Sequence, residues 1–289
     1  MIKIIILLLI STSAYSAVLP KGNGFFLGDL SYSTSSALWL KGDEKHDYSG
    51  ADIQGNNQKA TRNYYQAGLH GYYGLGYGLQ IGLGIRYGTV NLSDAPILGA
   101  EKDDTFSQVS ELSLEISYQL IKRSKSDFVA AIRFSHPGKQ GRHHPEFLSF
   151  NDFTSYAELE LKHSWIFKKF DLYSLIKYKK TLTDLGNNHL ILEEKAYYKY
   201  QEELFFGLGI DYLSTDNGFD IADSDFNTYF ANQGFIPVWN KKESWIGLSI
   251  LGTYKLNRNW QLDSYLHRKI RGKNTGISTT MGIRFGRGF

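Results

Sequence analysis

The last stretch of the chain, residues 276–289, reads GISTTMGIRFGRGF and alternates between two kinds of side chain. One face is mainly apolar and carries Ile277, Thr279, Met281, Ile283, Phe285, Arg287 and Phe289. The other face is small or polar and carries Ser278, Thr280, Gly282, Arg284 and Gly286. A period of two indicates a β-strand, because successive side chains of a strand point to opposite faces. Soluble strands average about five or six residues, whereas a tilted strand that crosses a membrane needs about nine to eleven. This stretch is therefore typical of a membrane-spanning strand.

The same alternation recurs along the chain and predicts further strands. Together with the last one they are expected at 24–36, 60–74, 78–90, 108–121, 127–136, 153–166, 169–181, 198–213, 244–256, 260–271 and 276–289. We expect periplasmic turns at the short connections 75–77, 122–126, 167–168 and 257–259. We expect outer loops at the long connections 37–59, 91–107, 137–152 and 182–197. Bacterial single-chain barrels have an even number of strands. The scheme therefore requires one more outward strand between 213 and 244, and residues 218–229 are its candidate.

The fold class that follows is all-β: a transmembrane, antiparallel up-and-down β-barrel, most simply of twelve strands, with ten or fourteen left open. Aromatic residues at the ends of the apolar faces, such as Tyr65 and Tyr73, suit the aromatic girdles of such a barrel. Composition excludes other classes. A net charge of +3 gives no case for a nucleic-acid partner. The absence of cysteine rules out a disulfide framework, and no long apolar run after the N-terminus indicates a membrane helix.

The first sixteen residues have the pattern of a secretory signal peptide. Lys3 provides the positive start, Ile4 to Ile10 form an apolar run, and Ala14-Tyr15-Ser16 places small residues at both recognition positions of a cleavage site. We therefore expect residues 1–16 to be removed and residues 17–289 to form the barrel.

The aromatic end of the last strand resembles the signal that is read by the bacterial outer-membrane assembly machinery. Phe285 and the terminal Phe289 carry this resemblance. It implies that the protein lies in the cell outer membrane. Its partners there would be the barrel assembly machinery, the outer-membrane lipids and lipopolysaccharide.

The N-terminal part of the mature chain carries a second resemblance. Residues 19–24, LPKGNG, lead directly into the aromatic strand FFLGDLSYS at 25–33, and YGLGYGLQIGL follows at 73–83. This looks like the outer-membrane barrels grouped as the meta-pathway phenol-degradation family, which are relatives of the long-chain fatty-acid and aromatic-hydrocarbon transporters. The resemblance implies passive uptake of small, often hydrophobic or aromatic molecules. Only residues 17–23 precede the first strand, so we expect no N-terminal hatch that plugs the lumen.

The polar faces of the strands predict which side chains line the lumen. The pore-lining candidates are Arg86, Glu115, Arg133, Glu158, Glu160, Lys162, Lys177, Lys179, Glu203 and Arg284. On the lipid face, Arg or Lys near the bilayer midplane would cost about 2–4 kcal/mol, so these residues are expected to point inward. Two interpretations are open. The charges pair and stiffen a closed interior, or they form a constriction that sets the selectivity of a polar pore.

Other functions have weaker support in the sequence. Some outer-membrane barrels are hydrolases with a His and Ser pair on a strand, but here Ser135-His136 is followed by Gly138 where such an enzyme has its serine. The loop histidines His143 and His144 could bind a metal with His136, although loop histidines are more often only solvated. We expect no enzyme activity, no cofactor and no metal site. A structural or adhesive barrel with a closed lumen is the main alternative, and the oligomeric state is left open.

Overall fold

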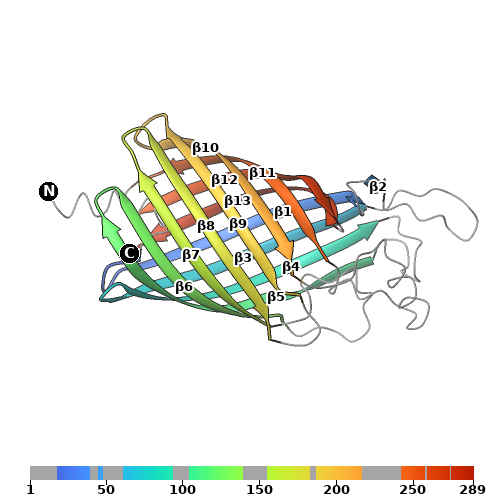
Figure 1. Ribbon diagram of the computed structural model, residues 1–289, viewed down its shortest axis with the longest axis horizontal. Coiled ribbons are helices and arrows are strands. Elements are labelled where there is room, and N and C mark those ends of the chain that lie inside the picture. Colours follow the sequence, from blue (N-terminus) through green and yellow to red (C-terminus); the bar gives the residue numbers. More distant parts are fainter. Residues whose placement is uncertain are drawn as a thin grey trace, which may run out of the picture.

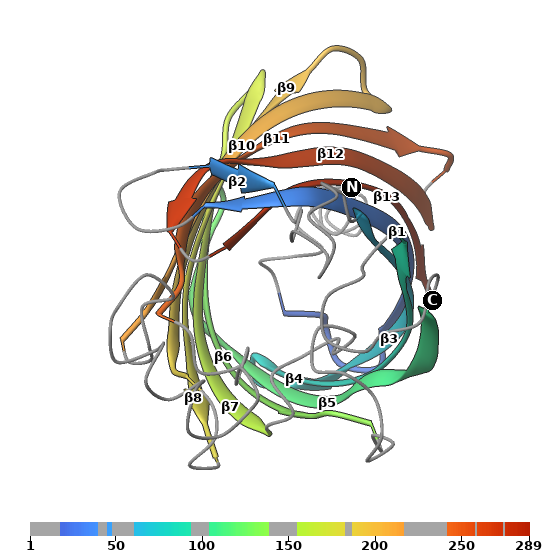
Figure 2. The same ribbon diagram turned by 90° about the vertical axis from the view of Figure 1, so that its right-hand side faces the viewer.

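The strands close into a single barrel (Figures 1 and 2). The computed structural model describes residues 18–39, 45–47, 61–93, 104–138, 155–182, 187–216, 242–257, 259–273 and 275–289. The strands are β1 (Gly24–Trp39), β2 (Lys45–Asp47), β3 (Thr61–Gly76), β4 (Leu79–Ser93), β5 (Asp104–Arg123), β6 (Ser126–His136), β7 (Tyr156–Ile166), β8 (Phe170–Thr181), β9 (His189–Lys199), β10 (Leu204–Thr215), β11 (Ser244–Lys255), β12 (Trp260–Lys273) and β13 (Thr275–Gly288). Within these ranges, no helix has the length and the hydropathy needed to cross a membrane.

Every neighbouring pair of strands is antiparallel, and the ring is closed by β1 and β13. Their register runs from Phe25 opposite Gly288 to Thr34 opposite Thr279 and beyond. At the C-terminal end, the amide of Gly24 donates to the carbonyl of Phe289 at 3.0 Å, and the amide of Phe289 donates back at the same distance. The short strand β2 pairs only with the end of β1 and takes no part in closure. Closure leaves no open edge in the ring of twelve strands.

The outer surface of the barrel is apolar on every strand of the ring. Side chains that are exposed here include Leu30, Leu69, Leu83, Ile116, Ile132, Leu159, Ile176, Leu192, Leu208, Ile250, Leu266 and Ile283. The aromatic residues expected at the strand ends, among them Tyr65 and Tyr73, are exposed on the same surface. A soluble protein rarely exposes so large a continuous apolar area. The prediction of a transmembrane barrel is therefore confirmed.

The predicted number of strands is confirmed, but the predicted position of the twelfth strand is wrong. Residues 189–199 form β9, although most of them were expected in the outer loop 182–197. The expected strand 198–213 begins only at Leu204, after a turn. Strand β10 pairs directly with β11, so the described residues place no strand between them. The candidate 218–229 lies outside the described residues.

The turn between β3 and β4 is one of the two shortest of the predicted short connections. Gly76, Tyr77 and Gly78 all have positive φ angles, of 96°, 53° and 76°. Glycine adopts this left-handed backbone without a steric penalty, whereas tyrosine does not. Tyr77 is 95% exposed, so no packing contact compensates for its conformation.

Candidate functional site

Four neighbouring strands, β5 to β8, place their charged residues in adjacent positions on the inner wall. In the register, Glu115 of β5 lies opposite Arg133 of β6, and Arg133 lies opposite Glu158 of β7. Glu160 of β7 lies opposite Lys177 of β8. Because alternate residues of a strand share a face, Glu158 and Glu160 both point into the lumen. The period-two pattern of the sequence thus becomes a lateral row of charges across four strands.

These charges form one continuous network, which we call the ladder and define as Glu115, Arg133, Glu158, Glu160, Lys162 and Lys177. Arg133 donates from Nε to Oε2 of Glu115 at 3.0 Å, and its Nη1 lies 4.0 Å from Oε1 of Glu160. Lys162 bridges the same two carboxylates, with its Nζ 3.2 Å from Glu115 Oε1 and 2.7 Å from Glu160 Oε2. Lys177 continues the network, with Nζ 2.7 Å from Glu160 and 3.2 Å from Glu158. Cations and carboxylates alternate along the ladder, so every charged group lies next to at least one group of opposite charge.

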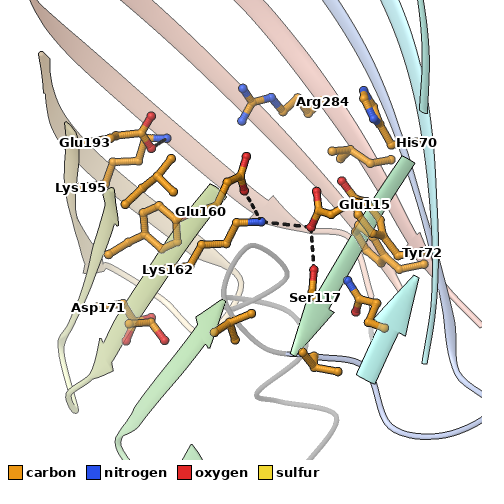
Figure 3. Close-up of a pocket in the computed structure, with 18 of the residues that line it drawn as sticks. His70, Tyr72, Glu115, Ser117, Glu160, Lys162, Asp171, Glu193, Lys195 and Arg284 are labelled. Atoms are coloured by element: carbon orange, nitrogen blue, oxygen red, sulfur yellow. Dashed lines mark hydrogen bonds and ion pairs between the residues drawn. The ribbon is translucent and has the colours of Figure 1, made fainter. Parts of the chain in front are cut away.

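The ladder is strongly desolvated. Glu160 is 1% exposed, and Glu115 and Glu158 are also buried. Hydroxyl groups on the same wall complete the network, since Ser117 donates to Glu115 at 2.8 Å and Ser135 donates to Glu158 at 3.3 Å. Figure 3 shows Lys162 reaching toward both Glu160 and Glu115 in the interior of the barrel. A buried charge is tolerated only when it is paired and hydrogen-bonded, and this arrangement meets that condition.

The remaining predicted cations lie on other parts of the inner wall. Arg284 points into the lumen (Figure 3), and its guanidinium carbon lies 4.9 Å from the centre of the Tyr265 ring. Arg86 lies 3.6 Å from Glu111. Glu111 precedes Glu115 by four residues on β5, so this pair lies on the side of the ladder away from the short β5–β6 turn. Lys179 stacks on the Tyr156 ring at 3.6 Å. These three residues therefore face the interior, as the sequence predicts, but they are not part of the ladder.

A cavity of about 250 Å³ lies in the lumen beside the ladder. Its lining combines charged and aromatic side chains, including Glu115, Arg133, Glu160, Tyr72, Tyr173, Lys195, Tyr197, Phe205 and Arg284. A wall of this composition offers hydrogen-bond partners of both signs together with ring faces. The space accommodates small solutes, and the long ladder side chains narrow it from one side.

One predicted pore residue is misplaced, and two charged lumen residues of β9 were not predicted. Glu203 lies exposed in the turn between β9 and β10 and not on a strand facing the lumen. Lys195 and Glu193 of β9 pair with each other and point inward. All three differences have one cause, since residues 189–199 were not recognised as a strand. The signal that could have revealed β9 is the alternation of Leu190, Leu192, Ala196 and Tyr198.

The aromatic residues of the last strand lie on the outer surface. Phe285 packs against Trp260 with ring centres 4.6 Å apart, and Phe289 stacks on Phe26 at 5.1 Å. Both rings lie near the seam between β1 and its neighbours. Their role as an assembly signal stays a prediction.

The residues considered for hydrolysis do not face one another. Ser135 is buried in the lumen and donates to Glu158, whereas His136 is exposed and forms a hydrogen bond with Ser155 at 2.6 Å. His143 and His144 lie outside the described residues. Among the described side chains, no group of three or more His, Asp or Glu residues is arranged to hold a metal ion.

Comparison with known proteins finds similarity in structure alone. No protein-family model and no curated protein sequence matches the chain. The COG4313 outer membrane channel from Pseudomonas putida F1 is similar with a TM-score of 0.68 and 15% identity, over 95% of this chain and 98% of that one. The NanC porin is similar with a TM-score of 0.52 and 10% identity, over 90% and 98% of the two chains. The translocator domain of the autotransporter NalP from Neisseria meningitidis reaches 0.51 with 7% identity, over 96% and 92%. At these identities the likeness establishes the barrel fold, which the two resemblances in the sequence also imply.

Proposed function

We propose that this chain is an outer-membrane channel through which small molecules diffuse passively. The observation that carries the proposal is the contrast between the two faces of one closed wall. The outside is apolar on every strand of the ring, while the inside holds a charged ladder beside a cavity of about 250 Å³. A charged wall around an internal space suits the passage of polar solutes. The structural likeness to an outer membrane channel and to a porin supports the same function.

The lining of the cavity suits the passage of small solutes that have both polar and apolar parts. The ladder pairs its own charges, so it excludes bulky solutes by size more than by net charge. Tyr173, Tyr197 and Phe205 offer ring faces on the wall beyond it. Aromatic rings interact favourably with other rings and with cations. This lining is compatible with the small, often aromatic molecules that the family resemblance implies.

A closed scaffold is the second candidate, and the complete pairing of the ladder favours it. Each ladder carboxylate contacts at least one cation at 3.2 Å or less. Charges that satisfy one another can stiffen an interior without admitting any solute. In that case the long outer segments would contact a partner and the lumen would serve only stability.

Liposome swelling separates the two candidates. Purified protein is reconstituted into vesicles, and swelling rates are measured for neutral solutes of increasing size, with empty vesicles as the control. The channel predicts swelling with the smallest solutes and a sharp decline as solute size increases. Swelling no faster than that of empty vesicles with any solute would contradict the channel and favour the scaffold. Hydrolysis of a model ester by the same preparation would contradict the expectation that the protein is not an enzyme.

A further inference from the structure

The residues that precede β1 enter the barrel instead of leaving it. Val18 and Leu19 are among the most buried apolar residues of the described chain, with 6% and 8% of their surface exposed. Val18 also lines the lumen cavity. Although the sequence predicts no N-terminal hatch, this short segment therefore lies inside the barrel. We define residues 18–20 as the strap.

A tight turn folds the strap back into the barrel. The amide of Asn23 donates to the carbonyl of Pro20 at 3.1 Å, and Gly22 between them has a φ of +82°. This is the geometry of a type II turn, which requires a positive φ at its third residue and favours glycine there. The turn is tied to the wall by hydrogen bonds from Gly22 to Gly74 at 3.0 Å and from Gly74 to Asn23 at 2.9 Å.

Two glutamines of the wall hold the buried end of the strap. The amide of Leu19 donates to Oε1 of Gln80 at 3.0 Å, and the amide of Val18 donates to Oε1 of Gln119 at 3.1 Å. Gln119 is itself oriented, because its Nε2 donates to the carbonyl of Ile121 at 2.7 Å. Its oxygen is thereby directed toward the strap. Two such hydrogen bonds favour one position of the short segment, because each offsets part of the entropy that is lost when the segment is ordered.

The wall also leaves space for the strap. A side chain at Gly74 would place its Cβ 2.2 Å from the carbonyl oxygen of Pro20 and 2.4 Å from that of Leu19. Both contacts are with backbone, which cannot move aside as a flexible side chain can. Glycine at this position is therefore what allows the strap to lie against β3.

The strap lies at a different level from the ladder. Gln119 lies on the same inner face of β5 as Glu115. It is four residues closer to the short β5–β6 turn, which corresponds to about 13 Å along the strand. The lumen is therefore obstructed at two levels, by side chains in the ladder and by backbone in the strap.

We propose that the strap, positioned by Gln80 and Gln119, is a second constriction that restricts the size of the permeating solute at the periplasmic mouth. This inference rests on the proposed channel function. The strap differs from the ladder in chemistry, because it presents apolar side chains and peptide groups without charge. A solute that passes the ladder must still pass Val18.

The absence of cysteine from the chain makes a direct test possible. Val18→Cys is labelled with a small cationic thiosulfonate reagent during single-channel recording in a planar bilayer. The inference predicts loss of most of the current on labelling and its recovery with a reducing agent. Lys168→Cys is the matched control, since Lys168 is exposed in the turn between β7 and β8, and its labelling should leave the current unchanged.

A second variant tests the positioning residues. Replacing Gln80 and Gln119 together with leucine removes both acceptors at similar side-chain size, and should release the strap and raise the conductance. If the wild type conducts and complete labelling of Val18→Cys leaves the current of that variant unchanged, the strap is overturned as a constriction and the channel function stands. Absence of current in the wild type would instead overturn the channel function on which the inference rests.

Discussion

Replacing Glu160 with glutamine tests whether the ladder is a desolvated constriction. Glu160 is 1% exposed and contacts three cations: Lys162 and Lys177 at 2.7 Å, and Arg133 at 4.0 Å. The substitution keeps the size of the side chain and removes one negative charge. Three buried cations then share the two remaining carboxylates of the ladder. Loss of one partner from a buried ion pair typically costs about 3–5 kcal/mol, so we expect the free energy of unfolding to fall by this amount.

The matched control is Glu193→Gln. Glu193 also faces the lumen and pairs with a lysine, but its side chain is 23% exposed and the pair stands outside the ladder. Partly solvated ion pairs contribute less than about 1 kcal/mol to the free energy of unfolding. The assay is equilibrium unfolding by urea of the protein folded in lipid vesicles, followed by tryptophan fluorescence. Equal losses of stability in the two variants would refute the reasoning, because water would then solvate the ladder as freely as the wall around Glu193.

Three further predictions concern assembly, a turn and processing. Phe289→Ser removes the ring that stacks on Phe26 at 5.1 Å and should lower the amount of heat-modifiable barrel in the outer membrane; normal amounts under strong expression would contradict the assembly signal. Tyr77→Asn places a residue that tolerates positive φ in the β3–β4 turn and should raise the free energy of unfolding by up to about 1 kcal/mol, measured by urea unfolding; a loss of stability would show that Tyr77 is needed at the membrane interface. N-terminal sequencing of the membrane-embedded protein should begin at Ala17, and a sequence that begins at Met1 would contradict the signal peptide.

The strands were predictable because the barrel has two unlike surroundings. Each residue of a strand meets either lipid or the lumen, so the alternation of Leu112, Leu114 and Ile116 with Glu111, Ser113 and Glu115 is visible in the sequence. The inward direction of the ladder residues was predictable for the same reason. The parity of bacterial barrels also gave the correct strand number, although it did not show where the missing strand lies.

Strand β9 was missed because its alternation is interrupted. Glu194 follows Glu193 directly, and a carboxylate on the outer face is unexpected in a membrane strand. In the structure the hydroxyl of Ser174 on β8 donates to Glu194 at 2.6 Å. This contact depends on the register of two strands and has no local signal.

The pairing within the ladder and the position of the strap also depend on long-range register. Arg133 meets Glu115 only because β5 and β6 pair in one register, which includes an irregularity between Gln119 and Ile121. The strap meets partners that are 61 and 101 residues away along the chain. A single sequence shows which residues face the lumen, but it does not show which of them touch.

The charge selectivity of single channels tests the central claim most directly. Arg86 and Arg133 are replaced together by serine, and conductance and reversal potential are measured in a planar bilayer across a salt gradient, beside the wild type. Both guanidinium groups face the lumen and pair with carboxylates, Glu111 and Glu115, which the double variant leaves without these partners. If the barrel is a channel narrowed by its charged side chains, the wild type conducts and the variant shows a higher conductance. The reversal potential of the variant is also shifted toward the equilibrium potential of the cation. Absence of current from both proteins, with only a loss of stability in the variant, would contradict the channel and leave a closed scaffold.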